Sequence, residues 1–89
     1  VYIFIEAMAD SLVKQGMPRD MAYEFVSNTL IGAAKMVIET GEHPGKLKDM
    51  VCSPGGTTIA GVAALEEHGF RNSIIKATEA CYKKAEGVE

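Results

Sequence analysis

Apolar residues recur at three- and four-residue spacing along most of the chain, and this is the spacing of one face of an α-helix. The first such segment covers residues 2–15, where polar side chains form a second stripe. Gly16 then stands where a glycine commonly ends a helix, and Pro18 follows two residues later. We therefore predict a first helix that ends near Gln15.

A second, longer helix is predicted from about Pro18 to Thr40, with Gly41 as its stop. Apolar residues cover more than one of its faces, and a helix of that kind must be surrounded by other elements. A domain of 89 residues is too small to cover so long a helix easily on every side. We therefore expect a second copy of the chain to supply the cover in an interleaved homodimer. The alternative is that the other helices of the same chain suffice.

Three further helices are predicted, over residues 46–51, 57–68 and 70–86. A turn at residues 42–45 precedes the first of them, and Gly69 separates the last two. His68 lies near a helix C-terminus, where we expect it to act as a cap. The prediction is an all-α bundle of about five helical segments that forms one domain over residues 1–89.

Composition supports closely packed helices and excludes several partners. The chain is 47% hydrophobic with no Trp, so its apolar surface comes mainly from aliphatic residues. A net charge of −3 without a basic stripe argues against nucleic acid. The charge-free apolar segment at residues 25–34 is too short and too polar to span a bilayer.

Cys52 and Cys81 have no C-x-x-C neighbour and no histidine at metal-ligand spacing, so we predict no metal site. We expect both to be reduced and half-buried in a cytoplasmic protein, although a disulfide between them is the alternative. The chain opens on Val1 with neither Met nor a basic segment and runs directly into a helical pattern. We expect a fragment that begins inside a helix, without a signal peptide.

The stretch richest in chemistry is the run Ser-Pro-Gly-Gly-Thr-Thr at residues 53–58. Pro54 suits the first position of a helix, and the glycines allow the backbone to approach a bound group closely. N–H groups at a helix N-terminus lack intrahelical partners and bind anions. Thr57 replaces the Lys that a P-loop requires, so a single carboxylate fits better than a nucleotide phosphate. The alternative is an ordinary turn that binds nothing.

Several runs of residues share one resemblance. They are Glu-Ala-Met-Ala-Asp at 6–10, Gly-Met-Pro at 16–18, Gly-Ala-Ala-Lys-Met at 32–36, His-Pro-Gly-Lys-Leu-Lys-Asp-Met-Val at 43–51, Ser-Pro-Gly-Gly-Thr-Thr-Ile at 53–59 and Gly-Phe-Arg at 69–71. With these runs the sequence resembles the C-terminal domain of the pyrroline-5-carboxylate reductases over essentially all 89 residues.

The resemblance implies an oxidoreductase of proline biosynthesis. Members of the family reduce the cyclic imine 1-pyrroline-5-carboxylate to L-proline with NADPH or NADH. They have an N-terminal Rossmann domain, whose G-x-G-x-x-G motif is absent from this sequence, and a helical C-terminal domain that dimerises by interleaving. Many assemble further into rings of dimers. This chain is then the dimerisation and substrate-binding part, with no cofactor-binding residue and no activity of its own.

The resemblance also implies roles for individual residues. The substrate-binding positions are Val51, Ser53, Gly55, Gly56, Thr57 and Thr58. The Ser53 hydroxyl and the N–H groups of residues 56–58 correspond to the contacts with the substrate carboxylate, and the Thr58 hydroxyl corresponds to the group that helps to protonate the ring nitrogen. Gly41 departs from the acidic residue that relatives often carry there. The alternative function is a structural dimerisation module without a ligand.

Overall fold

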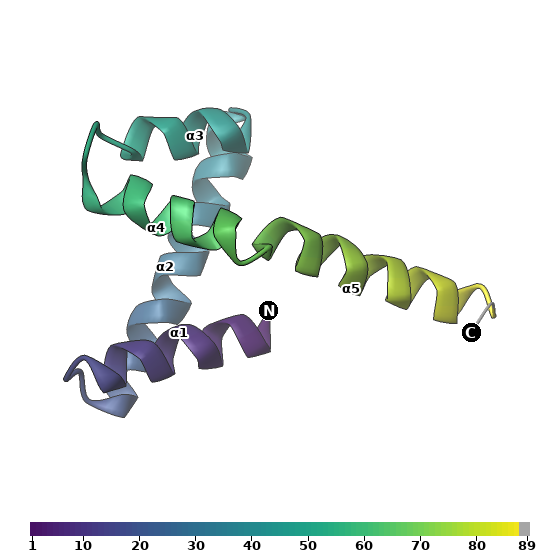
Figure 1. Ribbon diagram of the computed structural model, residues 1–89, viewed down its shortest axis with the longest axis horizontal. Coiled ribbons are helices and arrows are strands. Elements are labelled where there is room, and N and C mark those ends of the chain that lie inside the picture. The colour runs from purple at the N-terminus through teal and green to yellow at the C-terminus, as the bar shows by residue number, and fades with distance from the viewer. Residues whose placement is uncertain (88–89) are drawn as a thin grey trace. The chain divides into compact units, whose positions relative to one another are not determined.

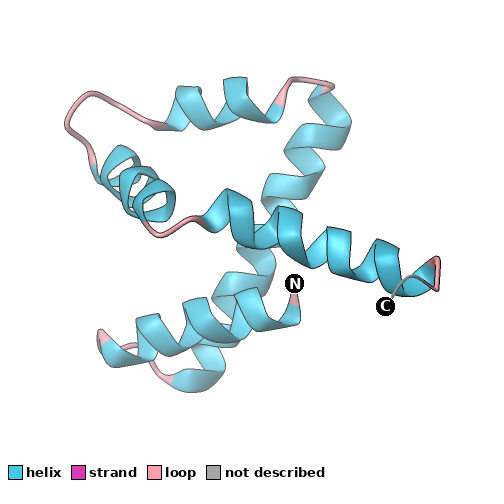
Figure 2. Ribbon diagram, turned by 45° about the vertical axis from the view of Figure 1, so that its right-hand side comes forward, coloured by secondary structure: helices cyan, strands magenta, loops and turns pink. Residues whose placement is uncertain are grey.

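The computed structural model describes residues 1–87, which contain α-helices and no strand (Figures 1 and 2). The helices are α1 (Tyr2–Lys14), α2 (Arg19–Thr40), α3 (Pro44–Val51), α4 (Thr57–Glu67) and α5 (Phe70–Ala85). The all-α prediction is confirmed, and each predicted helix is present. The largest difference in bounds is at α3, which begins at Pro44 and not at residue 46.

Short local signals set the ends of these helices. Pro18 precedes α2 in an extended conformation (φ −57°, ψ 141°), as its ring and missing N–H favour. Gly41 ends α2 in the left-handed region (φ 67°). The Nδ1 atom of His68 lies 2.9 Å from the Ala64 carbonyl oxygen at the end of α4, and this confirms the predicted capping role.

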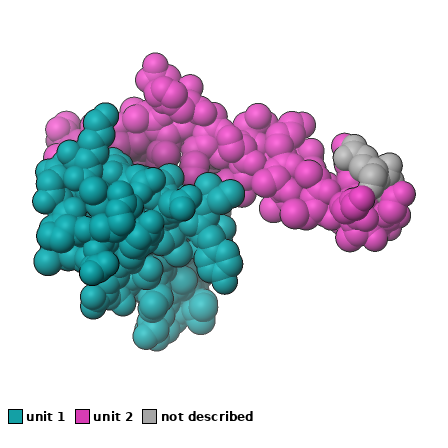
Figure 3. Space-filling model, turned by 90° about the horizontal axis from the view of Figure 1, so that it is seen from below, with its two compact units in different colours: residues 1–47 teal, residues 48–89 magenta. Residues whose placement is uncertain are grey.

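The chain divides into two compact units, residues 1–47 and 48–89, with the boundary inside α3 (Figure 3). In the first unit α1 packs on α2, and Ala9, Ala22 and Val26 are fully buried between them. Two of these residues are alanines, so the helices approach closely with little side-chain volume between them. Partly buried apolar side chains surround the three, namely Ile5, Leu12, Val13 and Met17.

Arg19 joins the same two helices at the surface. Its Nη1 donates a hydrogen bond of 2.6 Å to Asp10 Oδ1, and its guanidinium carbon lies 5.8 Å from the centroid of the Tyr23 ring. The hydrogen bond to Asp10 raises the pKa of Arg19 above its ordinary value. Because both charged side chains are about half exposed, this pair contributes little to stability.

In the second unit α4 packs against α5, and no residue of that unit is fully buried within 48–87. Large apolar side chains are exposed on all five helices. On α2 they include Phe25, 53% exposed, and Ile38, 79% exposed. Neither unit, taken by itself, buries the apolar surface that its sequence carries.

Within residues 1–87 the helices are too short or too polar to cross a membrane. The same residues hold no group of three or more His, Cys, Asp or Glu side chains placed to bind a metal ion. Cys52 and Cys81 are both free thiols, the first half-buried and the second exposed.

Val26→Ala tests the contact between α1 and α2. The substitution removes two methyl groups from a fully buried site, so we expect the free energy of unfolding to fall by about 1.5 to 3 kcal/mol in urea titrations. Val1→Ala is the control, since Val1 is 89% exposed, and it should change stability by less than about 0.5 kcal/mol. Equal losses for the two variants would show that Val26 is not part of the core.

Candidate functional site

The run at residues 53–58 spans the loop between α3 and α4 and the first residues of α4. The Gly56 N–H donates to the Ser53 carbonyl at 3.0 Å, which closes a turn over residues 53–56. Gly55 has φ 70° at the third position of this turn, where type II turns need a glycine, and Pro54 stands at the favoured second position. Pro54, which the sequence suggested could take the first position of a helix, belongs instead to the turn, and α4 begins at Thr57 as predicted.

Helix α4 starts directly after the turn. Gly56 is its N-cap, in an extended conformation (φ −82°, ψ 176°), and the Ala60 N–H donates the first helical bond to the Gly56 carbonyl at 3.4 Å. The N–H groups of Thr57, Thr58 and Ile59 precede that bond and have no acceptor within the helix. They face the same end of α4, where the macrodipole adds a partial positive charge.

The structure changes one detail of the predicted site. The Gly56 N–H was expected to be a free donor, but it is already bonded to the Ser53 carbonyl. Ile59, which the sequence did not indicate as a donor, supplies a free N–H in its place. The turn type determines this exchange, and the Pro-Gly pair at residues 54–55 was the signal that could have revealed it.

The side chains at this junction are polar and uncharged. Ser53, Thr57 and Thr58 are exposed, and within residues 1–87 their hydroxyls have no protein partner. No charged side chain occurs in residues 50–65. Residues 50–65 would hold an anion here through N–H and hydroxyl groups, a set of donors that suits one carboxylate. Val51, the last residue of α3, is 63% exposed, and its place in the site stays a prediction.

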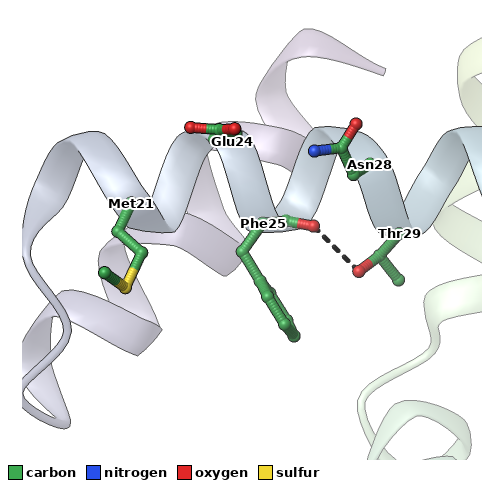
Figure 4. A pocket seen from close by; sticks show the side chains of 5 residues that line it. All are labelled: Met21, Glu24, Phe25, Asn28 and Thr29. Atoms are coloured by element: carbon green, nitrogen blue, oxygen red, sulfur yellow. Dashed lines mark hydrogen bonds between the residues drawn. The ribbon is translucent and has the colours of Figure 1, made fainter.

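Within residues 1–87, two hollows are lined by side chains from outside the 53–58 run. The larger, about 560 Å³, follows α2 and is lined by Met21, Glu24, Phe25, Asn28 and Thr29 (Figure 4). Figure 4 shows Met21, Phe25 and Thr29 on one side of the helix, with the Thr29 hydroxyl donating to the Phe25 carbonyl at 2.8 Å. Sequence reasoning had not identified this groove, although its residues follow helical spacing.

A smaller hollow of about 310 Å³ lies in the second unit. Val62, Leu65, Phe70 and Ile74 form its apolar part. Arg71, at its edge, donates from Nε to Glu66 Oε1 at 2.9 Å, so that its charge is already paired. Neither hollow includes a residue of the 53–58 run.

Comparison with known proteins gives one family throughout. Residues 1–88 match the family model described as pyrroline-5-carboxylate reductase dimerisation. The pyrroline-5-carboxylate reductase of Escherichia coli (strain K12) is 62% identical over 86 residues, which cover 97% of this chain and 32% of that protein. The corresponding protein of Glycine max is 52% identical over 85 residues, which cover 96% of this chain and 31% of the relative.

Solved structures agree with this result. The pyrroline carboxylate reductase of Plasmodium falciparum, crystallised with NADP bound, superposes with a TM-score of 0.93 at 34% identity, over 98% of this chain and 35% of that one. The 1-pyrroline-5-carboxylate reductase of Streptococcus pyogenes also superposes with a TM-score of 0.93, at 38% identity, over 97% of this chain and 33% of that one. The chain thus spans about a third of the length of the relatives that it matches.

Gly55→Ala tests the turn that precedes α4. A Cβ at φ 70° is strained, so we expect a loss of about 1 to 2 kcal/mol in the free energy of unfolding. Gly61→Ala is the matched control, because Gly61 lies inside α4 with open space around it and should gain up to about 1 kcal/mol. A stabilising Gly55→Ala would contradict the left-handed turn.

Proposed function

The chain belongs to the pyrroline-5-carboxylate reductase family, and on this basis we propose that it is the dimerisation and substrate-binding domain of such a reductase. The enzyme would reduce 1-pyrroline-5-carboxylate to L-proline with NADPH or NADH, in the biosynthesis of proline. The observation that carries the proposal is the match of the family model to residues 1–88. The cofactor is bound mainly by another domain, and this chain contributes no cofactor-binding residue.

The substrate carboxylate binds at the N-terminus of α4 in this proposal. The N–H groups of Thr57 and Thr58 and the Ser53 hydroxyl donate to its two oxygens. Gly55 and Gly56 keep the backbone free of bulk on that side, and Val51 forms an apolar wall. The free donors and the absence of charged side chains in residues 50–65 support a carboxylate over a phosphate. Because the carboxylate is fixed, the ring is held in one orientation, and this can lower the activation barrier by several kcal/mol.

The reaction adds a hydride to the imine carbon and a proton to the ring nitrogen. The nicotinamide, when bound, supplies the hydride. The hydroxyl of Thr58, the second residue of α4, hydrogen-bonds to the nitrogen as the C=N electron pair moves onto it. It gives its own proton to the nitrogen and regains one from solvent, or it passes on a proton from a water molecule. Thr57 contributes its backbone N–H only.

The partner of the chain in this proposal is a second copy. Residues exposed on α2, such as Phe25 and Ile38, would be buried by interleaved helices of the other protomer, and dimers can assemble into rings. The description of the matched family as a dimerisation domain supports this arrangement. We also propose a cytoplasmic location, because both cysteines are free.

The dimer is tested by sedimentation equilibrium. We expect a dimer at micromolar concentration, and we expect Phe25→Glu to raise its dissociation constant at least about tenfold, because a carboxylate would be buried without a partner. Glu39→Gln, an exposed polar position on the same helix, is the control and should leave the constant unchanged. A well-folded monomer would refute the interleaved arrangement.

Thr58→Val tests the role in proton transfer, in the full-length enzyme. The variant keeps the β-branched shape and loses only the hydroxyl, so kcat should fall roughly 5- to 150-fold with a smaller change in KM. Thr57→Val is the control and should retain both constants. If neither variant changes the kinetics of 1-pyrroline-5-carboxylate reduction, the loop is only a turn and the chain is a structural dimerisation module.

A further inference from the structure

The two adjacent glycines of the α3–α4 loop differ in what their backbones require. Gly55 has φ 70°, a conformation in which a residue with a side chain is strained, and no atom beyond its chain neighbours lies within 4 Å of where its Cβ would be. Gly56 has φ −82° and ψ 176°, an extended conformation that any residue adopts. Its backbone therefore gives no reason for a glycine at position 56.

Position 56 also lacks a side chain that could cap the helix. It is the N-cap of α4, where Ser, Thr, Asp or Asn normally accepts a hydrogen bond from an N–H of the first turn. Gly56 makes no such bond. The chain thus lacks a common source of helix stability at the very position where the free N–H groups begin.

The space that a Cβ would occupy at position 56 is filled by Ser53. The Ser53 Oγ would lie less than 3.0 Å from this Cβ, which is closer than Cβ atoms come to other heavy atoms in real structures. The Ser53 carbonyl oxygen and the Ser53 Cβ would lie 3.2 and 3.7 Å from it. The Ser53 carbonyl is held by the Gly56 N–H at 3.0 Å, so the backbone of the turn cannot move away without losing that bond. The hydroxyl is the group that can move, by rotation about χ1.

We propose that Gly56 is a positioning residue, whose missing Cβ keeps the Ser53 hydroxyl beside the start of α4, where it can donate to a carboxylate bound by the N–H groups of residues 57 and 58. This inference rests on the proposed function, in which Ser53 contacts the substrate carboxylate. A Cβ at position 56 turns the hydroxyl away and removes one donor from the anchor.

Gly56→Ala in the full-length enzyme measures this effect. Losing one hydrogen bond to a carboxylate should raise KM for 1-pyrroline-5-carboxylate roughly 10- to 100-fold, with kcat nearly retained, because the contact is made equally in the ground and transition states. Some loss of stability is expected as well, because alanine is a poorer N-cap than glycine and the Ser53 carbonyl oxygen, 3.2 Å from the new Cβ, does not move with the hydroxyl; KM is therefore measured under conditions in which the variant is fully folded. Gly61→Ala is the control and should leave KM unchanged. An unaltered KM for the folded Gly56→Ala variant would overturn the proposal.

The double variant separates positioning from other effects. Once Ser53→Ala has removed the hydroxyl, adding Gly56→Ala should change KM by no more than about twofold, because the two residues act through one contact. Effects on KM that multiply in the double variant would overturn the inference about Gly56 while leaving the role of Ser53 intact. If Ser53→Ala alone does not change KM, the proposed carboxylate contact fails, and the inference fails with it.

Discussion

The apolar faces of α2 must be buried against other helices, and the rest of this structure depends on that constraint. In the first unit α1 covers it along one side through a small contact at Ala9, Ala22 and Val26. Apolar residues elsewhere on α2 remain in contact with solvent. Burial of apolar surface is the main favourable term in folding, and a chain of this size has few other sources of stability. The chain therefore depends on apolar surface from outside its own first unit, as the dimerisation family to which it belongs implies.

The junction of α3 and α4 shows how one tight turn sets out the backbone donors at the start of a helix. One turn bond, from the Gly56 N–H to the Ser53 carbonyl, fixes the angle at which the chain enters α4. Three N–H groups then remain at the helix end, and hydroxyls on both sides of the turn extend the set of donors. The two glycines serve this geometry differently, one through its dihedral angles and the other through the volume that it leaves to Ser53.

Sequence reasoning predicted the helices well because glycines and prolines mark their ends. Gly41 and Gly69 stand outside regular helix in the left-handed region, where the apolar periodicity stops. It missed the start of α3, where the Nδ1 of His43 accepts a hydrogen bond from the Gly45 N–H at 2.9 Å and extends the helix back to Pro44. It also misplaced Pro54 and the Gly56 N–H, because both depend on a turn closed between residues three apart. The α2 groove could not be predicted, because the spacing of apolar residues does not show which face of α2 the neighbouring helices leave exposed.

The uncharged character of residues 50–65 affects how a substrate would reach and leave the proposed site. Peptide dipoles act within the first turn of a helix, and their attraction falls off faster with distance than that of a lysine or arginine. Such an anchor does not itself steer an anion from far away, so any long-range attraction would have to come from charged groups outside residues 50–65, such as Lys46 and Lys48. The anchor also carries no proton that a change of pH between 5 and 8 would remove. The hold of such an anchor on a carboxylate would then rest on short-range contacts, in binding and in release alike.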